Sequence, residues 1–256
     1  MAQTKTARTA ARESGRADAA RRSQFEHHHR DIQGGSARAA VFGVSDGLVS
    51  NVSLILGLAG ANPSNAVIRL AGLAGLLGGA FSMAAGEYIS MRAQKELFLR
   101  EIEIERREIE RHPTSEHREL VHLYESRGIP AELASRLADE MMADPKLALE
   151  THAREELGVN PDSLGQPIAA AASSFATFSV GAIVPLVPFL TGSGGTAVIA
   201  AVVATAVAAL VVGGLLSVFT GRNWWWSAIR QLLICAVAGG VTYGIGHAIG
   251  VSGVAS

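Results

Sequence analysis

Carboxylates and imidazoles recur at regular spacing in the middle of the chain. Glu101, Glu105 and Glu108 stand at positions i, i+4 and i+7, which places them on one face of a helix. Oxygen ligands on packed helices, with imidazole nearby, are typical of sites for divalent metals. For these three glutamates taken alone, the alternative is a solvent-exposed helix face on which the carboxylates form ion pairs with neighbouring arginines. The candidate metal ligands are Glu101, Glu105, Glu108, Glu116, Glu119, His152, Glu155 and Glu156.

A second set of polar atoms interrupts apolar segments. Asp46 stands within Val41–Ala61, a segment otherwise apolar and long enough to cross a bilayer. An ionisable side chain at membrane depth is costly, so it marks an ion path or a proton relay. Methionine sulfur adds a soft ligand suited to late or borderline transition metals. The candidate transport path consists of Asp46, Asn51, Met83, Glu87 and Met91.

The elements that carry these residues follow from composition. Hydrophobic residues make up 48% of the 256 residues, and the mean hydropathy is +0.26, which is high for a cytosolic protein. Each apolar run approaches the roughly 20 residues that span a bilayer as a helix. We therefore predict an all-α membrane protein with five transmembrane helices, at Ala39–Ala61, Val67–Met91, Pro167–Leu190, Ala197–Thr220 and Ala228–Val254.

The charged stretch between the second and third runs is too long for a turn. Glu87–Arg111 contains no glycine or proline, so the second span is expected to continue as one helix that ends before Pro113. Three short helices follow, at Ser115–Ser126, Pro130–Met142 and Lys146–Gly158. The predicted organisation is a disordered basic arm (1–35), two spans (36–91), a cytosolic helical metal-binding domain (92–166) and three spans (167–256).

Lysine and arginine gather in the N-terminal arm, the middle stretch and the connection between the last two spans, which predicts that these regions face the cytosol. The C-terminus then lies outside. The net charge of −1 gives no support for nucleic acid as a partner. No cleavable signal precedes the first span, which favours a bacterial inner membrane. His27–His29 is interpreted as part of a polar linker rather than a metal-capture site.

Three motifs in order resemble the vacuolar iron transporter family, which contains the yeast and plant vacuolar iron and manganese carriers and their bacterial relatives. The motifs are Gly43-Val-Ser-Asp-Gly-Leu-Val-Ser-Asn, Ser82-Met-Ala-Ala-Gly-Glu-Tyr-Ile-Ser and Gly181-Ala-Ile-Val-Pro-Leu-Val-Pro, around the glutamate-rich insertion. The similarity runs from about Gln33 to the C-terminus, and the sequence is identified as a bacterial-type member.

The resemblance implies a homodimer in the lipid bilayer that moves Fe²⁺, or Mn²⁺, out of the cytosol in exchange for protons. It implies a membrane path at Asp46 and Met83, with Glu87 near the inner mouth. No cofactor and no enzymatic activity are implied, since the metal is the substrate. The family's cytosolic ligands match Glu105, Glu108, Glu116, Glu119 and Glu156.

One position departs from the pattern, because plant-type members have a methionine pair where this chain has His152-Ala153, which puts the metal preference in question. A membrane-anchored metal sensor or storage adaptor without flux is the alternative function. A diiron oxidase ranks last, because it needs two Glu-x-x-His pairs on facing helices. Within the charged insertion, Glu119-Leu-Val-His122 has that spacing and no second pair does.

Overall fold

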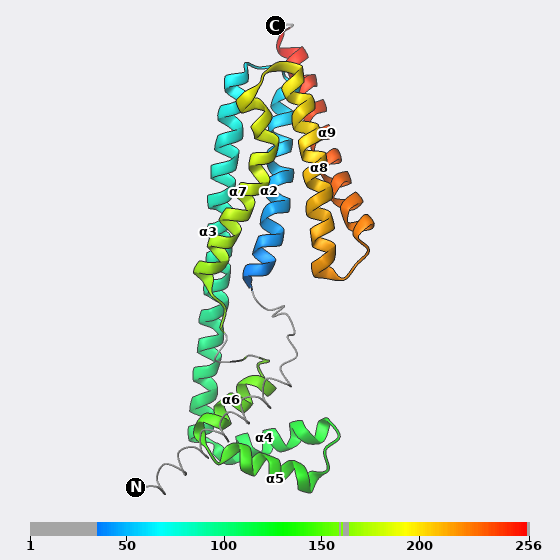
Figure 1. Cartoon of the computed structure of the whole chain (residues 1–256). Coiled ribbons are helices and arrows are strands. Elements are labelled where there is room, and N and C mark those ends of the chain that lie inside the picture. Colours follow the sequence, from blue (N-terminus) through cyan, green and yellow to red (C-terminus); the bar gives the residue numbers. More distant parts are fainter. Residues whose placement is uncertain (1–34, 159, 161–163, 255–256) are drawn as a thin grey trace, which may run out of the picture. The chain divides into compact units, whose positions relative to one another are not determined.

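The computed structural model describes residues 35–158, 160 and 164–254. All regular secondary structure in this part is α-helical, which confirms the predicted class (Figure 1). The basic arm and His27–His29 lie outside the described residues. The helices are α2 (Gly35–Gly60), α3 (Asn65–Arg111), α4 (Pro113–Ser126), α5 (Ala131–Met142), α6 (Pro145–Glu155), α7 (Pro167–Thr191), α8 (Gly194–Thr220) and α9 (Trp224–Val254).

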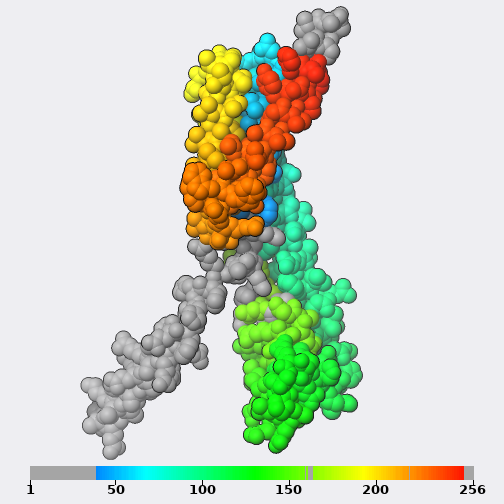
Figure 2. All heavy atoms as spheres, turned by 90° about the vertical axis from the view of Figure 1, so that its right-hand side faces the viewer, coloured from blue at the N-terminus to red at the C-terminus, as the bar shows by residue number. Residues whose placement is uncertain are grey.

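Five of these helices, α2, α3, α7, α8 and α9, are long and apolar enough to cross a membrane. Their outward surfaces are apolar: Ile199, Val203 and Val211 on α8 are each more than half exposed. Figure 2 shows the face formed by α8 and α9, in yellow to red. In water such a surface would aggregate, whereas a bilayer solvates it. The protein is therefore a multi-pass membrane protein, as the hydropathy pattern predicts.

Helix α2 packs between α7 and α9. Glycines permit the close approach, because a Cβ at Gly47 would overlap the Phe178 carbonyl and one at Gly181 would overlap the Val44 carbonyl. Backbones that touch in this way are typical of helix contacts in membranes, where small residues replace bulky ones. This packing buries Asn51 of α2, whereas Asp46 and Ser50 on the same helix stay exposed.

Helix α3 is a single 47-residue helix that leaves the apolar bundle and continues to Arg111, as predicted. The C-terminal half of α3 contains ion pairs between residues three or four positions apart, including Arg92 with Glu96 and Arg106 with both Glu103 and Glu110. Such pairs support a helix that has few buried contacts. α4 begins at Pro113, because proline fits the first turn of a helix but not its interior.

The three short helices differ from the predicted ones mainly at their ends. α4 starts two residues earlier than expected, and α6 runs from Pro145 to Glu155 instead of reaching Gly158. Asp144 caps α6, since its side chain accepts hydrogen bonds from the backbone N–H groups of Lys146 and Leu147 at 2.8 and 3.1 Å. α4 and α5 share an apolar core, and α6 packs against α3.

Candidate metal site and membrane cavity

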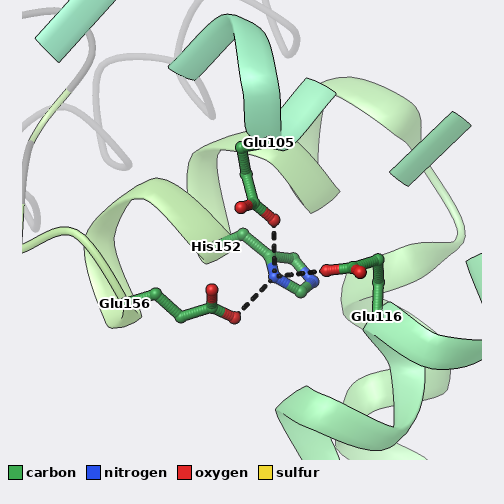
Figure 3. Close-up of side chains that lie close together, drawn as sticks. All are labelled: Glu105, Glu116, His152 and Glu156. Carbon is green, nitrogen blue, oxygen red and sulfur yellow. Dashed lines mark hydrogen bonds and ion pairs between the residues drawn. The ribbon is translucent and has the colours of Figure 1, made fainter. Parts of the chain in front are cut away.

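One cluster, with buried Glu116 and His152 and an exposed Glu156, joins three helices (Figure 3). Glu105 from α3, Glu116 from α4, and His152 and Glu156 from α6 and its C-terminal cap offer ligand atoms that all lie within 4.8 Å of one another. The wholly buried His152 has its Nδ1 2.8 Å from a Glu156 oxygen, 3.0 Å from Glu105 and 3.7 Å from Glu116. We call these four residues the glutamate–histidine cluster. Its ligand types suit a divalent transition metal.

The cluster concentrates negative charge in a poorly solvated place. Burial raises the pKa of Glu116, and the charges of Glu105 and Glu119 raise it further. Burial and the charge of Glu105 likewise raise the pKa of Glu156. For His152, burial alone would lower the pKa. Its hydrogen bonds with Glu105 and Glu156, together with the negative charges of these two residues, raise the pKa above its ordinary value. The protons held in this way are what a divalent cation would displace.

The other predicted ligands stand outside this group of four. Glu108 hydrogen-bonds the histidine that follows α3, at 2.8 Å, and Glu155 pairs with Arg127. Glu119 lies near enough that its charge raises the pKa of two cluster glutamates. None of the described contacts joins Glu101 to the cluster. The participation of these four residues in metal binding stays a prediction.

A cavity of about 320 Å³ opens at the surface of the apolar bundle, between α2, α3 and α7, and Asp46 and Ser50 in its lining are exposed. Three predicted path residues, Asp46, Asn51 and Met83, line it. The space exists because the facing surface of α3 carries glycine at two successive turns. The remaining lining residues are Ser50, Leu54, Gly75, Gly79, Ser82 and Phe178. A carboxylate, an amide and a thioether thus share one cavity at membrane depth.

Two predicted path residues are not part of this lining. Glu87 follows Met83 by one turn of α3, and Met91 is buried with its methyl group close to Gly165. Their place in a path stays a prediction. Phe178 is a lining residue that the sequence does not reveal, because nothing in an apolar span separates an inward aromatic from one that faces lipid.

Comparison with known proteins identifies the family. The model of the VIT family matches residues 37–247. "Vacuolar iron transporter" of Acanthamoeba castellanii is 35% identical over 213 residues, which cover 83% of this chain and 78% of that protein. "Vacuolar iron transporter 1" of Oryza sativa subsp. japonica is 30% identical over 231 residues, covering 89% of this chain and 92% of that protein. The chain therefore belongs to the VIT family, a family of transporters rather than enzymes.

Proposed function

We propose that the protein moves a divalent transition metal out of the cytosol in exchange for protons. The observation that carries the proposal is the cavity lined by Asp46 and Met83 on the membrane-spanning helices α2 and α3. A carboxylate oxygen beside a thioether sulfur suits a borderline cation better than Mg²⁺ or Ca²⁺. Relatives named vacuolar iron transporters favour Fe²⁺ as the substrate. The family resemblance of the sequence motifs makes Mn²⁺ the second candidate.

In this proposal the N-terminus and a metal-binding domain, residues 92–166, are cytosolic, and the C-terminus lies outside a bacterial inner membrane. The distribution of lysine and arginine supports this orientation. A homodimer is the expected assembly, because five spans make a thin bundle and the family resemblance implies two subunits.

The transport cycle begins with capture. The glutamate–histidine cluster binds the cation, which displaces the proton of His152 and relieves the repulsion between the carboxylates. The cation then reaches the membrane path near Glu87 and Met91 and enters the cavity between Asp46 and Met83. Protonation of the cavity carboxylate from the far side weakens coordination, so proton entry and metal exit compete for the same oxygen atoms.

The test is uptake of Fe²⁺ and Mn²⁺ into proteoliposomes with and without a pH gradient. The wild-type protein should transport, and the gradient should accelerate it. Asp46→Ala should abolish uptake, while Ser53→Ala should not, because the Ser53 hydroxyl is satisfied by the Val49 carbonyl and lies outside the cavity lining. Metal binding by the cluster with no flux under any condition would support the sensor or storage function instead.

A further inference from the structure

The nitrogen and the oxygen of the Asn51 side-chain amide lie in different environments. It lies on α2 and is 2% exposed. Its Nδ2 donates a hydrogen bond to the Ala182 carbonyl of α7 at 2.6 Å, whereas its Oδ1 accepts none from any described residue. A carbonyl only accepts, so rotating the amide by half a turn would set oxygen against oxygen. The contact with α7 therefore fixes the direction in which the Asn51 oxygen points.

The fixed oxygen faces the cavity wall formed by α3. A Cβ added to Gly75 would lie 2.9 Å from Asn51 Oδ1, and both residues line the cavity that contains Asp46 and Met83. A buried amide oxygen without a donor is unfavourable, so natural proteins rarely leave one unless a ligand or water completes it. The space that a side chain at Gly75 would fill is taken by Asn51 Oδ1 and Leu54 Cδ2, so a ligand would reach the oxygen from the cavity that both residues line.

We propose that Asn51 Oδ1 is a metal ligand in the membrane cavity and forms a second binding position on the transport path, after Asp46. This inference rests on the proposed transport function and assigns a ligand atom and a role in selectivity to one residue of its path. Asn51 follows Asp46 by five residues, which is about 7.5 Å along the helix axis. Gly75 precedes Met83 by two turns of α3, so the amide and this glycine both lie further from the cytosolic side than Asp46 and Met83 do.

A neutral amide suits that position. A second carboxylate would hold a divalent cation more tightly and slow its release, whereas an amide oxygen supplies a hard ligand without adding charge. Hard oxygen ligands contribute more to Mn²⁺ binding than to Cd²⁺ binding, since thioether sulfur already satisfies the softer ion. Asn51 is therefore expected to bias the path toward harder cations.

The two ends of the amide can be tested separately in proteoliposomes that contain the full-length protein. Asn51→Ala removes both the oxygen and the N–H donor. Asn51→Asp keeps an oxygen but loses the donor to Ala182. For a ligand role, we expect Asn51→Ala to raise the KM for Mn²⁺ by about tenfold and that for Cd²⁺ by less. Asn51→Asp should keep a low KM for Mn²⁺ but lower kcat, because the added carboxylate slows release of the cation. A role confined to tethering α7 predicts equal losses for both metals and for both variants, which would overturn the inference.

A second variant avoids disturbing the contact with α7. Gly75→Ala would crowd the Asn51 oxygen and should also weaken Mn²⁺ transport, while Gly78→Ala, whose Cβ meets nothing within 4 Å, should not. Asp46→Ala separates this inference from the proposed function. If Asp46→Ala is inactive while Asn51→Ala and Gly75→Ala match the wild type, the Asn51 role alone is wrong. If Asp46→Ala transports normally, the proposed path through the cavity fails, and if the wild-type protein transports no metal, the transport function itself fails.

Discussion

Replacing Glu116 with glutamine should strengthen the metal-free fold and weaken metal binding together. Glu116 is 7% exposed, and its ligand atom lies within 4.8 Å of those of Glu105 and Glu156. At an effective dielectric constant of about 20, two unit charges at that separation repel by about 3.5 kcal/mol. When His152 carries a second proton, its attraction to the Glu116 carboxylate at 3.7 Å offsets part of this repulsion. Because the pKa of Glu116 is raised, protonation relieves a further part.

We therefore expect Glu116→Gln to raise the free energy of unfolding of the metal-free protein by about 1 kcal/mol, which corresponds to a rise in Tm of about 2–4 °C. Loss of a charged ligand should weaken Mn²⁺ binding by at least about tenfold, or about 1.4 kcal/mol. Thermal unfolding of the detergent-solubilised full chain with chelator, and calorimetric titration with Mn²⁺, measure the two effects. Glu125→Gln on the exposed side of α4 is the matched control. A lower metal-free Tm with unchanged Mn²⁺ affinity would refute the reasoning, because the cluster would then be a structural ion-pair network.

Acidification should weaken Mn²⁺ binding to the cluster more steeply than it weakens Mn²⁺ binding to carboxylates with ordinary pKa values. The reason is that two cluster glutamates and His152 have raised pKa values, so protons compete with the metal there. Calorimetric titration at about pH 7.5 and about pH 5.5 measures this effect. Groups whose pKa is raised by folding bind protons more tightly in the folded state, so the chelated protein should gain Tm as the pH falls through that window and lose it as the pH rises. Gly181→Ala should lower the free energy of unfolding by about 1–3 kcal/mol, and Tm with it, because its Cβ would overlap the Val44 carbonyl. Gly78→Ala should leave Tm unchanged or slightly higher, since alanine favours helices and the site is open.

The sequence predicts most of the fold because its local signals agree. Five apolar runs specify five spans, and the absence of glycine and proline from Glu87–Arg111 specifies the continuation of α3. The predicted end of α6 at Gly158 is wrong by three residues. Gly158 does adopt a left-handed conformation, with φ +63°, but the helix has already ended at Glu155. A glycine after a helix therefore indicated the turn and not the last helical residue.

The candidate metal site could be predicted only in part. Periodicity groups Glu101, Glu105 and Glu108 on one face of α3, but of these three only Glu105 joins the cluster. Which turn of that face is used depends on where α6 packs against α3, and no local pattern contains that information. The same limit applies to Asn51, whose residue type is visible in the sequence but whose amide direction is set by Ala182, a residue 131 positions away.

The continuous α3 separates capture from passage. Met83 lines the membrane cavity and Glu105 belongs to the cluster, and both are on this one helix, twenty-two residues apart. At the rise of an α-helix this is about 33 Å, far beyond any direct transfer of a cation between ligands. In the proposed cycle the cluster therefore supplies the cavity by releasing metal into the surrounding solution, which raises the concentration at the inner mouth. Capture and passage are distinct steps with distinct ligands in that cycle, so Glu116→Gln tests the first and Asp46→Ala the second.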